Sequence, residues 1–116
     1  MKQLILSILV IFSSGVFAGQ TITTGIPTGV GSWEKNGKAV FAVYFSKEDI
    51  NTVACNTMRR YLVTSDNRAY DSITSVLLTH YAARKKIVVY GTSACDDNPN
   101  GNSETLKWVC TEGNPC

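Results

Sequence analysis

Apolar residues follow two different spacings along this chain, and the first half carries the spacing of strands. Residues 20–32 mix β-branched residues with glycine and proline, which predicts one irregular or bulged strand that ends near Trp33. Asn36-Gly37 comes next, and an Asn-Gly pair is a strong hairpin signal. Residues 40–45 are apolar at every position. The strand that they predict is therefore buried on both faces or forms an interface on one.

One segment in the second half carries the spacing of a helix. Residues 58–64 are predicted to be a third strand, after which Ser65-Asp66-Asn67 offers oxygens that can cap a helix. Between about residues 69 and 84, apolar residues recur three and four positions apart, which defines one face of that helix. Basic residues at positions 84–86 suit its C-terminal end.

Two more strands are predicted after the helix, at residues 87–90 and 105–110. In the last one, Leu106, Trp108 and Cys110 alternate on one face, so Trp108 is predicted to lie in the core. Three strands, one helix and two strands is the order expected of an OB fold, a five-stranded Greek-key barrel. The predicted fold is therefore mainly β, a five-stranded OB-fold-like barrel with its helix between strands three and four, stapled by disulfides.

The N-terminus has the three parts of a cleavable secretory signal. Lys2 supplies the charge, residues 4–12 form a short apolar centre, and Val16-Phe17-Ala18 precedes the expected cut. That centre is too short for a membrane-crossing helix, which needs about 20 residues, although an uncleaved anchor is the alternative. We expect residues 1–18 to be a signal peptide and residues 19–116 to form one secreted or periplasmic domain.

All four cysteines lie in the expected mature domain, and four cysteines allow three pairings. Export makes disulfides the expected state. We expect Cys110 to pair with Cys116, because Gly113-Asn114-Pro115 favours a turn between them, and this leaves Cys55 for Cys95. Zinc is the rival interpretation, but these wide spacings and a single histidine match no standard zinc site. No metal or other cofactor is predicted.

The charge balance says little in favour of a nucleic-acid partner. The chain has 11 basic and 9 acidic side chains, and loss of Lys2 would leave ten and nine. Such a domain has no basic field to bind phosphates, so no nucleic-acid partner is predicted. Arg59-Arg60-Tyr61 could contribute to a nucleic-acid face of an OB fold, but a half-buried strand is the simpler interpretation.

Candidate chemistry is sparse, and the chain is predicted not to be an enzyme. His80 is the only histidine, and no Gly-x-Ser-x-Gly segment is present. The segment 96–101 resembles the first half of a calcium loop, but its twelfth position is Lys107 rather than glutamate, which favours a solvated turn. Trp33, flanked by polar residues near the hairpin, is the candidate for stacking on a sugar ring.

Several short motifs resemble a pattern found in small exported bacterial proteins. They are Cys55-Asn56, Arg60-Tyr61-Leu62, Ser65-Asp66-Asn67, the apolar helix at 72–78, and residues 85–92 leading to Cys95. In these motifs, spread over residues 37–116, the chain is similar to the B subunits of the subtilase-cytotoxin and pertussis-like toxins. A close C-terminal cysteine pair, as in Cys110 and Cys116, is also a feature of those subunits.

The resemblance implies an OB-fold subunit that assembles as a ring, usually of five, docks on host-surface glycans and carries a separate catalytic A subunit. The Tyr-Tyr-Ser segment by which the pertussis-like subunits hold sialic acid has no match in residues 20–32, so no sugar-contacting residue is carried over. The predicted function is a secreted, homo-oligomeric glycan-binding module. The alternative is an orphan periplasmic OB-fold protein that binds or inhibits another protein.

Overall fold

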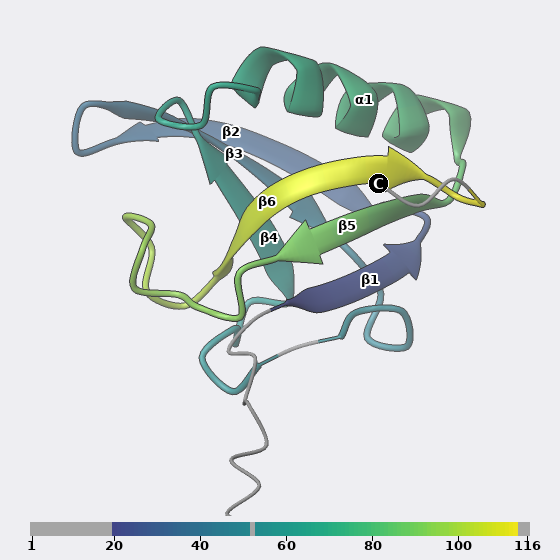
Figure 1. Cartoon of the computed structure of the whole chain (residues 1–116), viewed down its shortest axis with the longest axis horizontal. Helices are drawn as coiled ribbons and strands as arrows, with labels where there is room; N and C mark the ends of the chain where they lie inside the picture. The colour runs from purple at the N-terminus through teal and green to yellow at the C-terminus, as the bar shows by residue number, and fades with distance from the viewer. Residues whose placement is uncertain (1–19, 52, 114–116) are drawn as a thin grey trace, which may run out of the picture.

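The computed structural model describes residues 20–51 and 53–113, which form six strands and one helix (Figure 1). The predicted signal peptide, the expected start at Gly19 and Cys116 lie outside these residues. No helix within the described residues is long and apolar enough to span a membrane. The elements in chain order are β1 (Thr21–Gly25), β2 (Gly29–Lys35), β3 (Lys38–Tyr44), β4 (Arg60–Thr64), α1 (Tyr70–Ala83), β5 (Ile87–Gly91) and β6 (Glu104–Thr111).

The strands form one sheet in the order β1-β5-β6-β4-β3-β2. All neighbours are antiparallel except β4 and β6, which run parallel. β1 and β2 lie at opposite edges of this order although only residues 26–28 separate them. Because three residues span at most about 11 Å, the sheet must curve strongly to bring its two edges that close.

Three features of the predicted fold are wrong. The sheet has six strands instead of five and is open rather than a closed barrel, and the helix follows the fourth strand rather than the third. The strand count and the place of the helix differ because the single strand predicted before Trp33 is divided into β1 and β2. Pro27 lies at the division, where its missing N–H and fixed φ interrupt strand pairing.

β3 is buried on both faces, one of the two outcomes predicted for residues 40–45. Phe41 and Val43 belong to a main core on the side of α1, where the helix adds Ile73 and Leu77. Val40 and Ala42 point the other way and form a second, smaller core with Leu62. The two cores place β3 at the centre of a layered structure, with α1 lying over one face of the sheet (Figure 1).

The helix matches its predicted range within one residue, but its N-terminal cap differs. Ala69 holds the N-cap position and makes no side-chain cap hydrogen bond. The predicted capping segment bonds the turn just before the helix instead, since Asn67 Oδ1 accepts the Ala69 N–H at 2.9 Å. At the other end, Arg84 adopts the left-handed conformation, with φ of 54°.

Trp108 is not the core residue that alternation predicted, because its side chain is 39% exposed. A register shift between Tyr90 and Gly91 explains the difference. Leu106 pairs with Gly91 and Trp108 with Tyr90, so Lys107 is an extra residue that moves the following side chains to the other face. Trp108 instead packs on Tyr90, with ring centroids 5.4 Å apart.

The Cys55–Cys95 disulfide is confirmed, with a Cα–Cα distance of 6.1 Å. It joins the loop before β4 to the loop after β5. Cys110 is disulfide-bonded as well, but its predicted partner, Cys116, lies outside the described residues. Disulfides fit a protein that folds in an oxidising compartment.

A buried polar network joins β1, β4, β5 and β6. The fully buried Glu104 accepts hydrogen bonds from the Thr21 hydroxyl and, at 3.0 Å, from the Ser93 N–H. The Tyr61 hydroxyl lies 2.6 Å from Thr23 Oγ1. Gly91 allows this packing, since a Cβ there would lie 1.9 Å from Glu104 Oε2.

We predict that Gly91→Ala destabilises the fold by about 1–3 kcal/mol, because the added methyl group overpacks this network. The new Cβ would also lie 2.6 Å from Thr21 Oγ1 and 2.7 Å from Tyr61 Cε1. Gly101→Ala is the matched control, since a Cβ there meets no atom within 4 Å. Urea unfolding of both variants measures the difference, and equal midpoints would contradict the prediction.

The buried carboxyl of Glu104 should also make the stability of the fold depend on pH. Burial raises the pKa of its carboxyl above the ordinary value of 4.5, and no described group bonds its Oε1. As pH rises from that ordinary value toward the folded-state pKa, the native state retains a proton that the unfolded state has released. The contribution of Glu104 to stability therefore falls over this interval.

We expect Glu104→Gln to have nearly wild-type stability below this interval and to be more stable than wild type above it. The variant should gain about 1–3 kcal/mol of stability, because its side chain is neutral and no ionised carboxylate has to be buried with Oε1 unbonded. Thermal unfolding of both proteins across the pH range measures the difference. A difference that does not change with pH would show that the carboxyl does not titrate in this way.

Candidate functional site

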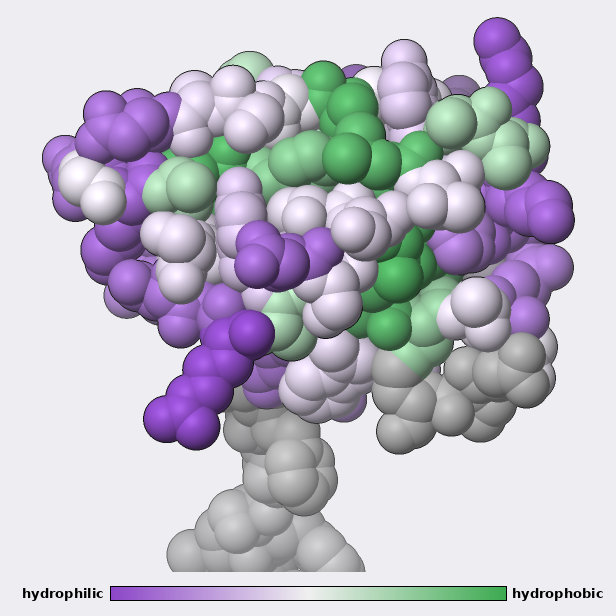
Figure 2. Space-filling model, turned by 90° about the horizontal axis from the view of Figure 1, so that it is seen from above, coloured by the Kyte–Doolittle hydropathy of each residue, from purple (hydrophilic) through white to green (hydrophobic). Residues whose placement is uncertain are grey.

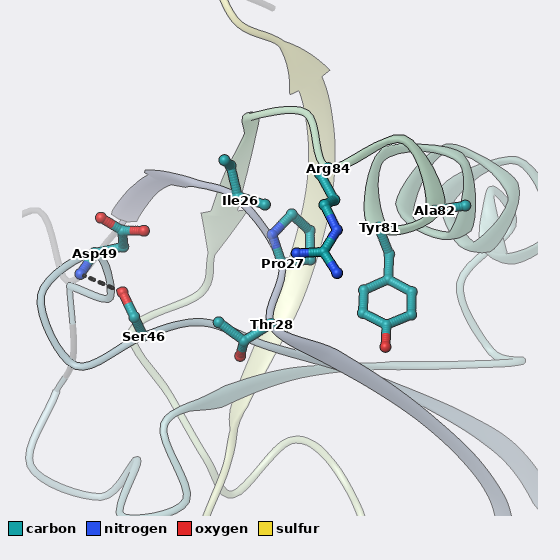
Figure 3. Close-up of a pocket in the computed structure, with 8 residues that line it drawn as sticks. All are labelled: Ile26, Pro27, Thr28, Ser46, Asp49, Tyr81, Ala82 and Arg84. Carbon is teal, nitrogen blue, oxygen red and sulfur yellow. Dashed lines mark hydrogen bonds between the residues drawn. The ribbon is translucent and has the colours of Figure 1, made fainter.

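A pocket of about 560 Å³ lies where the β1–β2 link, the loop after β3 and the end of α1 meet (Figure 3). Three segments far apart in the sequence supply its walls. The lining residues are Ile26, Pro27, Thr28, Ser46, Asp49, Tyr81, Ala82 and Arg84.

The β1–β2 link forms one wall, and its shape follows from Pro27. Pro27 is buried and ends β1, while the Thr28 N–H donates to the Tyr44 carbonyl at 2.8 Å as β2 begins. Ile26 and Thr28, on either side of the proline, are exposed. The interruption of the predicted strand therefore leaves an apolar side chain and a hydroxyl beside the pocket.

A tight turn after β3 forms the second wall. The Ser46 carbonyl accepts the N–H groups of Asp49 and Ile50 at 3.1 and 3.0 Å, and Ser46 Oγ accepts the Asp49 N–H at 3.3 Å. Gly25 makes room for Asp49, since a Cβ at that position would lie 2.7–2.9 Å from three of its side-chain atoms. The last residue of β1 thus fixes how closely this carboxylate can approach.

The C-terminal end of α1 forms the third wall. Tyr81 and Arg84 project from it toward the Pro27–Thr28 link in Figure 3. The Arg84 N–H donates to the Tyr81 carbonyl at 3.3 Å, which closes the last turn of the helix. A positive side chain is also favourable beside a helix C-terminus. The left-handed backbone at Arg84 ends the helix and turns the chain toward β5.

The pocket contains one carboxylate and one guanidinium whose side chains have no ion-pair or hydrogen-bond partner among the described residues. The ion pairs among the described residues, Lys38–Asp66 at 2.6 Å and Lys86–Glu112 at 3.9 Å, both lie outside the pocket. Asp49 can accept hydrogen bonds, Arg84 can donate them, and the nearby hydroxyls can do both. The Tyr81 ring adds a flat apolar surface. The arrangement can therefore bind a small ligand with many hydroxyl groups.

The residues singled out from the sequence lie elsewhere. Trp33 is half-buried on β2, with the Arg60 guanidinium carbon 4.8 Å from its ring centroid. Arg59 is exposed, whereas Arg60 is buried, so the two arginines do not form one charged face. His80 Nδ1 lies 2.8 Å from the Val76 carbonyl, within its own helix.

The calcium-like segment folds back on itself and on β6. Asn98 Nδ2 donates to the Ser103 carbonyl and to Thr105 Oγ1, both at 2.8 Å, and Asn98 Oδ1 accepts the Asn100 N–H at 2.8 Å. The Thr105 hydroxyl donates to Asp97. These side chains shape the turn between β5 and β6.

Sequence reasoning missed Asp49, Tyr81 and Arg84 as a group. Their separation in the chain hides the pocket, and the helix pattern explained Tyr81 and Arg84 without any ligand. One local signal was present, because Gly25 and Pro27 interrupt the first strand and so expose the link beside the pocket.

Comparison with known proteins gives a fold but no sequence family. No protein-family model matches the chain, and no curated protein matches it in sequence. Among solved structures, the chain is similar to one from a study described as the structural basis of subtilase cytotoxin SubAB assembly. The TM-score is 0.60 at 12% sequence identity, over 84% of this chain and 89% of that chain. At this identity the likeness shows a shared fold.

The backbone of Arg84 provides a way to remove its side chain from the pocket without damaging the fold. We predict that Arg84→Gly stabilises the domain by about 1 kcal/mol, since glycine adopts the left-handed conformation without steric cost. Ala83→Gly, one residue earlier inside α1, should instead destabilise it by about 0.5–1 kcal/mol. Urea midpoints measure both changes, and a loss of stability in Arg84→Gly would mean that the guanidinium itself supports the fold.

Proposed function

We propose that this chain is a secreted binding module similar to a toxin B subunit, which recognises host-surface glycans and delivers a separate catalytic chain. The observation that carries the proposal is the pocket between α1 and the β1–β2 link. It brings an unpaired carboxylate, an unpaired guanidinium, several hydroxyls and a tyrosine ring around one volume of about 560 Å³. In this proposal the chain binds and does not catalyse.

The chemistry of a sugar explains why these groups suit it. Each sugar hydroxyl both donates and accepts hydrogen bonds, so it needs a mixed lining such as Asp49, Thr28 and Ser46. The C–H face of the ring packs on an aromatic side chain such as Tyr81. Arg84 adds a planar donor that can bind the carboxylate of an acidic sugar with two hydrogen bonds. An acidic sugar is therefore the favoured ligand.

The shared fold and the disulfides support the rest of the proposal. When β1 and β2 are counted as one bent strand, the chain order becomes three strands, one helix and two strands, the order of an OB fold. Disulfides agree with export. A shallow single site binds weakly, and assembly as a closed ring, most simply a pentamer, would let several sites engage one surface.

The alternative is a periplasmic protein that binds or inhibits another protein. The exposed side chains of Leu78 and Met58, at 46% and 43%, favour a protein contact somewhere on the surface. This alternative predicts no response to any sugar, so glycan binding separates the two functions.

We predict that the purified domain binds a sialylated or other acidic glycan on an array. Binding should weaken about tenfold or more in Arg84→Gly, which removes the charged donor to the acidic group, and in Asp49→Asn, which weakens the acceptor for the sugar hydroxyls. Arg68→Gly is the matched control, since Arg68 is exposed in the turn before α1 and lies outside the pocket. Trp33→Ala should also leave binding unchanged.

Light scattering on the same preparation tests the ring. A strict monomer at tens of micromolar would exclude the oligomeric part of the proposal. If the glycan array shows no binding to acidic or neutral glycans, glycan binding is rejected and the protein-binding alternative is left.

A further inference from the structure

β2 is an edge strand with little protection against pairing with another chain. It pairs with β3 alone among the strands of residues 20–113, and the register of that pair is unbroken from Gly29 to Lys35. An edge strand directs alternate N–H and C=O groups outward, and proteins commonly guard such edges with lysine, proline or a bulge. Glu34 and Lys35 protect only the hairpin end of β2, since residues 29–33 contain no proline and no charged side chain. This stretch can therefore accept a further strand.

An apolar groove lies beside this edge on the helix side of the sheet. It has a volume of about 410 Å³ and lies between β2 and α1. Figure 2 looks onto the face of the molecule where α1 lies, and hydrophobic residues gather across its middle between hydrophilic ends. Leu78 of α1 is 46% exposed at this groove. The apolar residues that line it are Val30, Phe41, Tyr70 and Leu78.

On the opposite face of the same strands, Trp33, Tyr44 and Arg60 form one layer over the small core. Arg60 and Tyr44 are direct cross-strand neighbours, and the guanidinium carbon lies 4.8 Å from the Trp33 ring centroid and 5.6 Å from that of Tyr44. Arg60 Nη1 donates to the Tyr44 hydroxyl at 2.8 Å, and Nε donates to Ser103 Oγ at 2.7 Å. Tryptophan, tyrosine and arginine are the residues most enriched at the energetic centres of protein interfaces.

Arg60 is a buried charge without a countercharge. The residue is 7% exposed, and no carboxylate of the described residues lies within 4 Å of its guanidinium. Buried charges in proteins are normally paired, because neutral hydrogen bonds replace only part of the lost hydration. The two side-chain hydrogen bonds use two of the five N–H groups, so donors remain for an anion.

We propose that β2 accepts an extended segment of a partner polypeptide as an additional strand, with apolar side chains in the α1–β2 groove and a carboxylate on Arg60. Side chains of a strand alternate between the two faces of a sheet, and the added strand would lie about 4.8 Å from β2. The segment is therefore one in which apolar and acidic residues alternate. Backbone hydrogen bonds give such an added strand its affinity, and the side chains give it specificity.

A second copy of this chain does not fit as well. Its β1 edge exposes Ile22 and Thr24 on one face and buries Thr21 and Thr23 on the other, so it offers no carboxylate. The carboxylate on its β2 edge, Glu34, already accepts the Gly37 N–H of its own hairpin at 2.8 Å. The proposed acceptor edge also shares no residue with the pocket that contains Asp49 and Arg84. Strand addition at β2 is therefore independent of glycan binding, and it requires that the proposed ring close through a surface other than β2.

The test uses the folded, disulfide-bonded chain and capped synthetic peptides of about ten residues, the upper length of a common strand. One peptide alternates leucine and glutamate, a second replaces each glutamate with glutamine, and a third contains the first peptide's residues in non-alternating order. Calorimetry should show binding of the first peptide, about tenfold weaker binding of the second and least binding of the third. Hydrogen exchange should show new protection at residues 29–34 when the first peptide binds.

Variants of the chain identify the contacts. Arg60→Met should weaken binding of the glutamate peptide and remove its advantage over the glutamine peptide, whereas Arg59→Met, an equal charge change at an exposed neighbour, should change neither. Leu78→Ser should weaken both peptides, because it removes the apolar side of the groove. If Arg60→Met does not fold, the comparison of the two peptides on wild type still decides.

Three results would overturn the proposal. Glutamate and glutamine peptides could bind equally, no peptide could bind, or protection of β2 in the free chain could increase with protein concentration. The last result would assign the edge to a second copy. Each of these readouts is independent of the glycan array, which reports on Asp49 and Arg84.

Discussion

The burial of β3 on both faces is the constraint from which the rest of the structure follows. A strand with Val40 and Ala42 on one side and Phe41 and Val43 on the other must be covered twice. α1 and the curved sheet cover one side. A thin layer of Trp33, Tyr44 and the aliphatic part of Arg60 covers the other side. The arginine thereby buries a charge that an apolar residue at the same position would not.

The interruption of the first strand has an equally local cause and a wider effect. Pro27 separates β1 from β2, so consecutive segments of the chain occupy opposite edges of one curved sheet. The exposed link between them then meets the end of α1 and the turn at Ser46. A pocket forms there because three element ends converge. Its charged groups, Asp49 and Arg84, come from segments that are far apart in the sequence.

Periodicity predicted the elements well, because each strand or helix is set by side chains within a few residues of one another. The helix, the hairpin at Asn36-Gly37 and the Cys55–Cys95 pair all agree with the structure. Trp108 and the strand count were wrong for one shared reason, since a bulge and a proline each change strand geometry at a single residue. The pocket could not be predicted, because no pattern in the chain links position 49 to positions 81 and 84.

The Cys55–Cys95 bridge also determines how this domain would carry a tensile load. It closes a covalent ring over a sequence separation of 40 residues that contains β4, α1 and β5. A chain pulled from its two ends could therefore release only the segments outside the ring. At about 3.5 Å per extended residue, roughly 140 Å of contour length stays locked until the bridge is reduced. Under load, the domain would therefore extend at its two ends while the disulfide-closed segment keeps its length.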